Sequence, residues 1–328
     1  MPTRILVTGG AGFIGSHYAR ALLASDTRPQ VTVLDSLTYA GNLANLADVR
    51  DRPGFRFVTG DICDPHIVDR VVAGTDEIVH LAAETHVDRS ITGGAEFVRT
   101  NVLGTQVLLE AAVRHGVRRF VQVSTDEVYG SLPEGSWPEE HPLAPSSPYS
   151  ASKAAGDLLV LGHHTTYGLD VRVTRCCNNY GPGQYPEKIV PLFVTRLLNG
   201  GKVPLYGTGG NTREWMHVDD HVAALERVRT AGLPGRTYNI GSGVELTNRQ
   251  LTEALLEHCG ADWDSVELVP DRLGHDLRYA VDSGRIRREL GWEPRRDFRT
   301  ALAETVDWYR KNDDRWPAAQ DHRHLARP

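Results

Sequence analysis

Short, nearly continuous apolar runs recur along the first half of the chain, and each is followed by a turn and then a segment with helical periodicity. Runs of this kind, rich in Val, Ile and Leu, are typical of strands buried on both faces of a parallel sheet. Strands that alternate with helices predict a doubly wound α/β fold. We expect these strands at residues 4–8, 31–34, 55–59, 77–81, 119–124 and 170–175.

The alternation becomes looser after residue 175, where glycine and proline clusters and longer loops separate the helical segments. We therefore predict a Rossmann-like nucleotide-binding domain over residues 1–175 and a smaller C-terminal substrate-binding domain over residues 176–328. Residues 215–242 hold a helix and then a strand at 237–240, and we expect this segment to return to the first domain.

Composition excludes several classes of protein. The chain has 36 Lys and Arg against 42 Asp and Glu, a net charge of -6 spread along the sequence, which argues against a nucleic-acid partner. No apolar stretch approaches the roughly 20 residues of a membrane span, so we expect a cytoplasmic protein without a membrane partner. The cysteines form no CxxC pair, which favours buried thiols over a disulfide framework; they are Cys63, Cys176, Cys177 and Cys259.

A glycine-rich loop follows the first predicted strand. Gly9, Gly12 and Gly15 have the spacing GxxGxxG and precede a helical segment that begins at Phe13 and Ile14. Glycines allow a tight turn and let backbone amides approach a pyrophosphate at the helix N-terminus. Glycine spacing alone is weak evidence, but the strand before it and the helix after it predict a dinucleotide site.

The second predicted strand ends in Asp35, 20 residues after Gly15. An acid at this distance is placed to accept hydrogen bonds from the adenosine ribose and would repel a 2'-phosphate, so NAD is the expected cofactor. Asp61 and Ile62 follow the third strand and are candidates for the adenine end, although a simple turn would explain them nearly as well.

Tyr149 and Lys153 stand four residues apart in a segment that Ser147 can cap and that Pro148 can begin. They therefore share one helix face, where a lysine ammonium would stabilise the phenolate and lower the pKa of Tyr149. Surface helices often carry such a pair by chance. Together with the glycine loop, the YxxxK pattern resembles the short-chain dehydrogenase/reductase superfamily in its extended form, in which the tyrosine deprotonates a hydroxyl as NAD takes hydride.

Two adjacent carboxylates, Asp126 and Glu127, follow Thr125 at the end of the fifth predicted strand. This is the edge at which doubly wound sheets bind ligands. Adjacent acids are commonly solvated loop residues. A poorly solvated pair could instead divide into one protonated acid and one ionised base, which is what elimination of water next to a ketone requires.

Longer segments identify a family. The chain resembles the dTDP-glucose 4,6-dehydratases along nearly its whole length, in TGGAGFIGSH, LAAETHVDRS, STDEVYG, SPYSASK, TRCCNNYGPGQYPEK, GTGGNTREWMHVDDH, YNIGSG and GHDLRYAVD. The resemblance implies that Tyr149 with Lys153 deprotonates O4, that Thr125 binds the same hydroxyl, that Glu127 removes the C5 proton and that Asp126 protonates the departing C6 hydroxyl. It also implies a homodimer joined through helices near residues 96–115 and 147–167.

Further contacts are expected around the two nucleotides. Arg213 and Arg272 suit a pyrophosphate because guanidinium groups make paired bonds to phosphate oxygens. The remaining positions follow from the resemblance: Asn178, Asn239, Lys188, His275 and Glu84 for the nucleotide sugar, and Leu81 and Ala83 for NAD.

No metal site is expected, because the spaced pair His217 and His221 has Val218 where a metalloprotease helix would carry its glutamate. Three alternatives stay open. A nucleotide-sugar C4 epimerase would explain Tyr149 and Lys153 equally well but would not need Asp126. The others are a decarboxylase acting on a nucleotide uronic acid and an inactive NAD-binding regulator. The residues also leave open whether the base is thymine or uracil.

Overall fold

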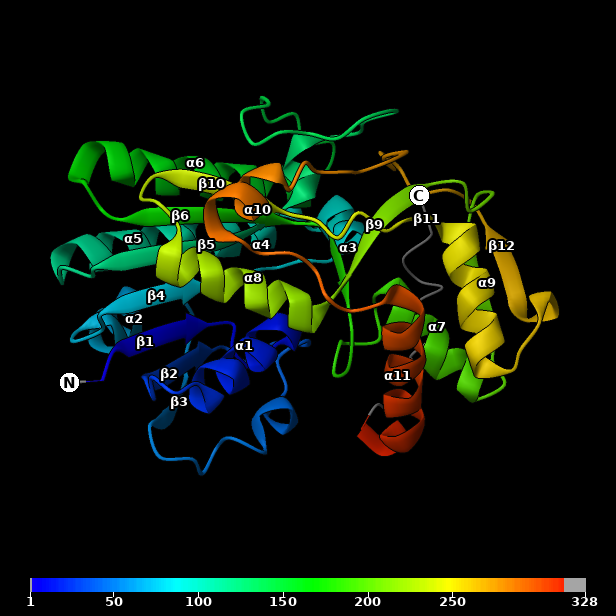
Figure 1. The fold of residues 1–328 in the computed structure, drawn as a ribbon, viewed down its shortest axis with the longest axis horizontal. Helices are drawn as coiled ribbons and strands as arrows, with labels where there is room; N and C mark the ends of the chain where they lie inside the picture. Colours follow the sequence, from blue (N-terminus) through cyan, green and yellow to red (C-terminus); the bar gives the residue numbers. More distant parts are fainter. Residues whose placement is uncertain (1, 316–328) are drawn as a thin grey trace.

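The computed structural model describes residues 2–315 and contains a seven-stranded sheet in which all paired neighbours are parallel (Figure 1). The strand order is β10-β6-β5-β4-β1-β2-β3. The strands are β1 (Arg4–Thr8), β2 (Gln30–Asp35), β3 (Phe55–Thr59), β4 (Glu77–His80), β5 (Arg119–Thr125), β6 (Val171–Cys176) and β10 (Arg236–Ile240). The predicted fold class and the six predicted N-terminal strands are confirmed, and no strand end differs from its predicted position by more than one residue.

The strand predicted at 237–240 forms most of β10, which pairs with β6 at one edge of the sheet. The preceding helix α8 (Val218–Ala231) packs against β5, β6 and α1, so residues 218–240 lie with the N-terminal sheet although they come late in the chain. Residues 316–328 of the expected second domain lie outside the described residues.

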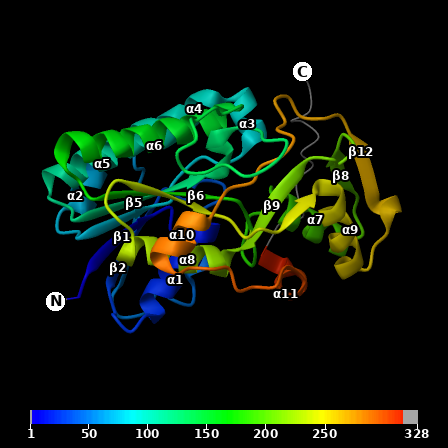
Figure 2. The same cartoon turned by 45° about the horizontal axis from the view of Figure 1, so that its top comes forward.

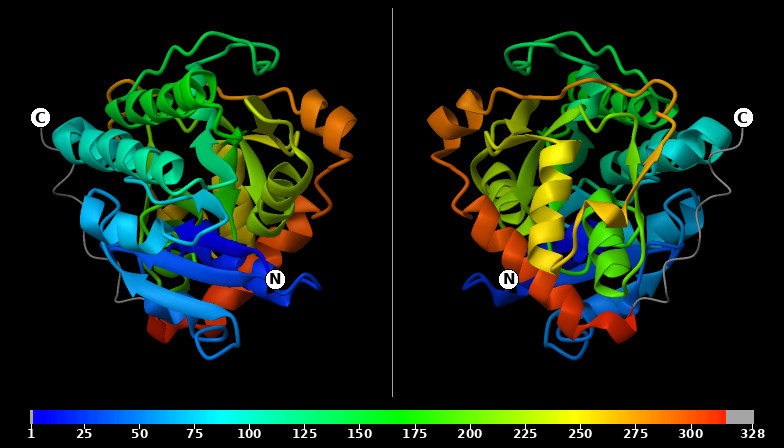
Figure 3. Two further views of the ribbon diagram at one scale, coloured as in Figure 1. Left: turned by 90° about the vertical axis from the view of Figure 1, so that its left-hand side faces the viewer. Right: turned by 90° about the vertical axis from the view of Figure 1, so that its right-hand side faces the viewer.

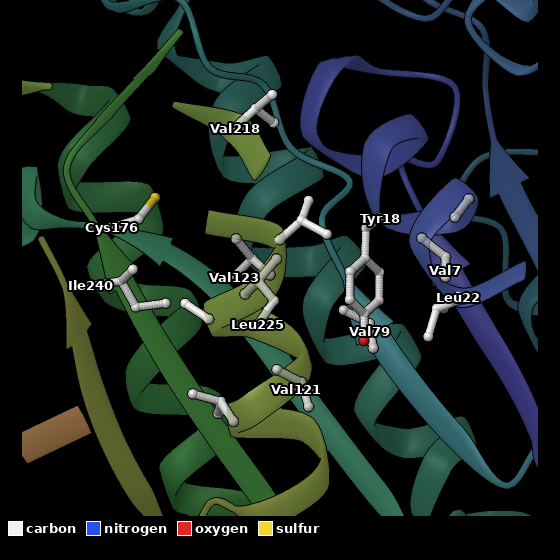
Figure 4. Close-up of a cluster of buried hydrophobic side chains, with 14 of the residues drawn as sticks. Val7, Tyr18, Leu22, Val79, Val121, Val123, Cys176, Val218, Leu225 and Ile240 are labelled. Atoms are coloured by element: carbon white, nitrogen blue, oxygen red, sulfur yellow. The ribbon is translucent and has the colours of Figure 1, made fainter. Parts of the chain in front are cut away.

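Helices cover both faces of the sheet, as the strands' apolar composition requires (Figures 1 and 2). On one face, α1 (Phe13–Ala24) and α8 bury Tyr18 and Leu225 against the strands (Figure 4). The short helix α10 (Gly284–Leu290) adds Ile286 to the same core. On the other face lie α2 (Pro65–Val72), α5 (Thr105–Arg114) and α6 (Pro148–Tyr167), which bury residues such as Leu108 and Val160.

A second lobe stands beyond one end of the strands (Figures 1 and 3). It contains two small sheets, β11-β9-β7 and β12-β8, and a separate apolar core that includes Phe193, Trp215 and Leu302. Its elements are β7 (Asn178–Tyr180), α7 (Ile189–Leu198), β8 (Val203–Tyr206), β9 (Thr212–His217), β11 (Glu245–Thr247), α9 (Asn248–Cys259), β12 (Val266–Val269) and α11 (Phe298–Lys311). The small sheets were not predicted, because four of their five strands have only three or four residues and carry too little periodicity.

Short helices complete the described structure and gather near the ends of the strands. They are η1 (Leu43–Leu46), α3 (Val87–Thr92), α4 (Gly94–Val98), the π-helical η2 (Arg99–Gly104), η3 (Asp126–Tyr129), η4 (Trp263–Ser265) and η5 (Asp313–Arg315). Within residues 2–315, no helix combines the length and apolar character needed to cross a membrane.

Candidate active site

A cavity of about 1160 Å³ lies between the carboxyl edge of the sheet and the second lobe. Parallel strands end at the same edge, so the loops after β1 to β5 converge on this space. It brings together every expected site residue except Asn239. The residues that line it are Gly9, Gly12, Phe13, Ile14, Gly15, Asp35, Asp61, Ile62, Leu81, Ala83, Glu84, Thr125, Asp126, Glu127, Tyr149, Lys153, Asn178, Lys188, Arg213, Arg272 and His275.

The glycine loop forms the tight turn expected of a dinucleotide site. Gly9 has a φ of +69°, and a Cβ there would lie 2.6 Å from the backbone nitrogen of Ala82. A Cβ on Gly15 would lie 2.2 Å from the carbonyl oxygen of Gly9. Gly12 occupies the N-cap of α1 and offers no side chain to the first amides of the helix. Those amides are therefore available to an anion, which fits the pyrophosphate of NAD.

Asp35 is fixed at the end of β2 by two backbone amides. Its Oδ2 accepts from Ala11 at 2.9 Å and its Oδ1 from Leu37 at 2.8 Å. Burial raises the pKa of this carboxyl, and the two amide hydrogen bonds oppose that shift. A carboxylate can accept about four hydrogen bonds, so capacity is left for ribose hydroxyls. The group fits the adenosine end of NAD.

Asp61 lines the cavity just after β3 and forms an ion pair with Arg99 at 2.7 Å. Its other oxygen accepts from the amide of Cys63 at 2.8 Å, which holds the turn after β3. Ile62 is buried beneath this turn. Arg99, which also lines the cavity, was not predicted because nothing in the sequence connects it to the third strand.

Helix α6 begins where the sequence predicts and places Tyr149 and Lys153 in the cavity wall. Ser147 and Ser150 form a capping box at its N-terminus, and Pro148 occupies the first turn. Tyr149 is 8% exposed and Lys153 is 6% exposed. The Lys153 ammonium donates to the carbonyl oxygen of Val123 at 2.8 Å, so α6 is tied to β5 directly beneath the site.

The two carboxylates follow Thr125 in the short helix η3. The hydroxyl of Thr125 donates to Oδ1 of Asp126 at 3.1 Å and accepts from the amide of Glu127 at 3.2 Å. Asp126 is 2% exposed, and its Oδ2 has no hydrogen-bond partner among the described residues. The acids are therefore not a solvated loop pair, because Asp126 is enclosed.

Their surroundings differ in a way that separates their ionisation. Burial raises the pKa of Asp126 well above its usual value, and the neighbouring charges of Glu127 and Glu214 raise it further. Burial also raises the pKa of Glu127, but the cations Lys188, Arg213 and Arg272 oppose that shift. The arrangement favours a protonated Asp126 beside an ionised Glu127.

The pKa of Tyr149 differs from the sequence-based expectation. Burial raises it well above its usual value, and the neighbouring acidic groups Glu127, Cys176 and Asp126 raise it further, whereas the hydrogen bond with Thr125 lowers it. Lys153 alone was expected to lower this pKa. The expectation rested on the face of α6 alone. The acidic residues of η3 face the same phenol and raise its pKa.

The second lobe supplies further cations to the cavity wall, in addition to Lys153 and Arg99. Arg213, from β9, donates to the carbonyl oxygen of Asp276 at 2.9 Å and lies 4.3 Å over the ring of Tyr279. Arg272 forms a 2.7 Å ion pair with Asp88 of α3, which links the second lobe to the sheet domain. Both guanidinium groups are thus held in place at the cavity wall.

Three further expected residues stand on the same wall. Lys188 donates to the carbonyl oxygen of Thr85 at 2.6 Å, and His275 contacts Asp271 at 2.6 Å. The side-chain oxygen of Asn178 is buried and lacks a hydrogen-bond partner among the described residues.

Glu84 is positioned through its backbone. Its amide and carbonyl groups both bond to the side chain of Asn101, at 2.9 and 3.0 Å, while burial raises the pKa of its carboxyl. Asn101 therefore fixes the segment that follows β4 at the cavity.

Asn239 does not line the cavity. Its side chain is fully buried, accepts from the hydroxyl of Tyr129 at 2.9 Å and donates to the carbonyl oxygens of Trp137 and Asp282. These bonds occupy its amide and join β10 to neighbouring loops. The expected contact between Asn239 and the substrate is therefore not supported by its position.

The spaced histidines have local roles. His217 caps α8 by accepting from the amide of Asp219, and His221 is fully buried with Nδ1 3.0 Å from Oδ1 of Asn179. Over residues 2–315, no group of three or more His, Cys, Asp or Glu side chains is arranged to hold a metal ion.

Sequence reasoning missed several residues of the cavity wall. Tyr206, Asp276, Tyr279 and Glu187 all line it. Asp276 and Tyr279 lie in the GHDLRYAVD segment that pointed to Arg272 and His275, so that segment could have suggested them. Tyr206 ends the short strand β8 and carries no sequence signal.

The sheet order, the glycine loop with Asp35, and the Tyr149–Lys153 pair define an extended short-chain dehydrogenase/reductase. A family model described as GDP-mannose 4,6 dehydratase matches residues 6–305. A dTDP-glucose 4,6-dehydratase of Streptomyces griseus is 63% identical over 96% of this chain and 97% of its own length. The chain belongs to this family of nucleotide-sugar 4,6-dehydratases, and within it to the dTDP-glucose 4,6-dehydratases.

Solved structures agree. DesIV of Streptomyces venezuelae, a dTDP-glucose 4,6-dehydratase with NAD and dTDP bound, is 60% identical with a TM-score of 0.94, covering 96% of this chain and 99% of DesIV. A UDP-glucose 4-epimerase of Thermotoga maritima is 33% identical with a TM-score of 0.88, covering 94% and 99% of the two chains. The fold is thus common to both activities, and the similarity to the dehydratase is greater.

Proposed function

We propose that this protein converts dTDP-glucose to dTDP-4-keto-6-deoxyglucose and water, with NAD as its cofactor. The observation that carries the proposal is the enclosed pair Asp126 and Glu127, which faces the same cavity as Tyr149 and Lys153. An epimerase needs the tyrosine and lysine alone, whereas removal of water needs an additional base and an additional acid.

NAD would be held by the glycine loop and Asp35, and its chemistry there would be reversible hydride transfer, from C4 and then to C6 of the sugar. Tyr149 takes the proton of the C4 hydroxyl, and Thr125 orients that hydroxyl. Lys153 serves as the buried cation that offsets the phenolate.

Glu127 then removes the C5 proton, which the C4 ketone makes acidic. Lys188, Arg213 and Arg272 oppose the effect of burial on its pKa, and an ionised carboxylate is the form that a base requires. Asp126, whose pKa is raised well above the usual range, keeps the proton that it donates to the leaving C6 hydroxyl.

The cationic wall of the second lobe receives the nucleotide. Arg213 and Arg272 bind the pyrophosphate oxygens, because each guanidinium group is already anchored and retains donors for an anion. Asn178, Lys188 and His275 complete this end of the site, and Glu84 lies on the sheet side of the cavity. We also propose that two domains share these roles. Residues 1–175, together with residues 215–242, bind NAD, and the remainder of residues 176–328 binds the nucleotide sugar.

The test is a reaction with dTDP-glucose in D₂O, followed by NMR of the sugar. A dehydratase gives a C6 methyl group and one deuterium at C5, since Glu127 exchanges its proton with solvent. An unlabelled sugar inverted at C4 would identify an epimerase and overturn the proposal. Tyr149→Phe is the control for any reaction that does not use this site.

We also propose a homodimer formed through α5 and α6, which contact each other at the surface. Large apolar side chains are exposed on these helices and on the preceding α4 and η2; they are Val98 (57%), Leu103 (50%), Val113 (37%), Leu158 (61%) and Tyr167 (61%). Burial of such a patch favours association. Light scattering should give twice the chain mass, and Leu158→Glu should give the monomer, whereas Leu43→Glu on η1 should not. A monomeric wild-type protein would contradict the proposal.

A cytoplasmic location is proposed on the state of the cysteines. The cysteines at 63, 176, 177 and 259 are all free thiols in the structure. Free thiols suit a reducing compartment. Fractionation of cells that produce the protein tests this location, and recovery of the protein outside the cytoplasm would contradict it.

A further inference from the structure

A row of charges continues beneath Tyr149 along α6. Tyr149, Lys153 and Asp157 are spaced four residues apart and therefore lie on one helix face. Asp157 has no exposed surface. Its Oδ2 pairs with Nε of Arg175, from β6, at 2.9 Å, and Arg175 is itself 3% exposed.

Charges this deeply buried are costly unless they are paired, and an apolar replacement of a buried pair is often at least as stable. The ion pair of Asp157 and Arg175 is balanced on its own, but Lys153 stands one helical turn from Asp157 on the same face, and the two charges interact. These three groups together carry one net positive charge, and the four groups including Tyr149 carry none once Tyr149 has lost its proton. Without Asp157, two cations would share the buried region.

Other titratable groups near Lys153 do not replace Asp157. Burial lowers the pKa of His80 to about 3 and raises the pKa of Cys176 to about 12, so both are uncharged near neutral pH. Asp126 holds its proton because burial raises its pKa. Burial lowers the pKa of Lys153, and Asp157 is the largest opposing influence. The groups that face this region from neighbouring elements are His80 from β4, Asp126 and Glu127 from η3, and Arg175 and Cys176 from β6.

We propose that Asp157 is a positioning residue for the reaction, which keeps Lys153 charged beneath Tyr149 and separates that ammonium from Arg175. The inference rests on the proposed function for its catalytic meaning, since Lys153 matters only if Tyr149 is the base. The charge state of Lys153, however, can be measured without substrate. Arg175 also donates to the hydroxyl of Tyr129 at 2.8 Å, and this bond helps to hold its guanidinium group beside Asp157.

The experiment is a pH titration of lysine side chains by NMR, in NAD-loaded protein labelled with ¹³C at lysine Cε. Lysine occurs only at positions 153, 188, 202 and 311, so the spectrum is simple. Lys153→Met identifies the signal. An opposite charge within about 4 to 6 Å shifts a pKa by roughly one to three units. In Asp157→Asn the midpoint of Lys153 should therefore fall by about one pH unit or more.

Two further variants keep the test decisive. Asp170→Asn removes an aspartate that pairs with Arg119 and Arg172 before β6, and it should leave the midpoint of Lys153 unchanged. If Asp157→Asn fails to fold, Asp157→Asn combined with Arg175→Gln removes both partners and should still lower the midpoint, by a smaller amount. A wild-type midpoint in whichever of these two variants folds overturns the proposal. A lowered midpoint in a protein without dehydratase activity would support it and reject only the proposed reaction.

Discussion

Replacement of Asp126 by asparagine should separate the two halves of the reaction. The side chain is 2% exposed, and Asn has nearly the same shape, so the variant should fold with the cavity preserved. The asparagine amide, however, cannot supply the acidic proton that the departing C6 hydroxyl needs. Loss of one general acid costs about 10²- to 10⁴-fold in rate, or about 3 to 5 kcal/mol in the barrier. Water loss should slow by that factor.

Oxidation at C4 should change by less than about tenfold, because Thr125, Tyr149 and Lys153 are all retained. Asp126 is a lesser contributor than Glu127 to the raised pKa of Tyr149, so its removal changes the first step little. A single turnover with excess protein, quenched at intervals and analysed by mass spectrometry, follows the substrate, the 4-keto sugar that still holds its water, and the product. In the variant the 4-keto sugar should accumulate.

Asp170→Asn is the matched control, since it makes the same chemical change near the opposite end of β6 and should react like the wild type. Equal slowing of oxidation and water loss in Asp126→Asn would refute the reasoning. It would mean that Asp126 shapes the site as a whole and does not act as the acid of the second step.

The remaining predictions concern the base, the cofactor loop and acid stability. Glu127→Gln should permit C4 oxidation but stop exchange of the C5 proton with solvent; full exchange, measured by NMR in D₂O, would remove Glu127 from that role. Gly15→Ala should weaken NAD binding at least about tenfold in a calorimetric titration, because the new Cβ would lie 2.2 Å from the carbonyl oxygen of Gly9. Gly162→Ala is the control, since no atom lies within 4 Å of a Cβ there, and it should bind NAD like the wild type. Equal affinities in the two variants would contradict this prediction. Burial lowers the pKa of His221 from 6.5 to about 3, so its stabilising contribution is complete above pH 6.5 and is lost as the pH falls toward 3. Relative to His221→Asn, the wild type should lose about 1.4 kcal/mol of unfolding free energy between pH 7.5 and 5.5 in urea titrations, and parallel pH profiles would refute this.

Local patterns were enough to predict the sheet. The strands from β1 to β6 each hold a short apolar stretch, and the turn chemistry around Gly12 and Ser147 indicated where α1 and α6 begin. The glycine loop, Asp35 and Tyr149 could be placed in one cavity because parallel strands share a carboxyl edge.

Properties that depend on distant segments could not be predicted in this way. Asn239 carries the right chemistry for a substrate contact, but Tyr129 and Trp137, about a hundred positions away, occupy its amide. The pKa of Tyr149 depends on burial and on the acidic residues of η3, which the spacing of residues along α6 does not reveal. Asp157 likewise gains its meaning only when β6 brings Arg175 against it.

The most direct test of the central claim uses the purified protein and dTDP-glucose with no NAD added. Mass spectrometry of the nucleotide sugar should show the loss of one water, because the cavity that is lined by Asp126 and Glu127 is also lined by the glycine loop and Asp35, which we expect to retain the cofactor. The same protein with Tyr149→Phe should leave the mass unchanged. An isomer of unchanged mass from the wild type, or no reaction even after NAD is supplied, would contradict the account.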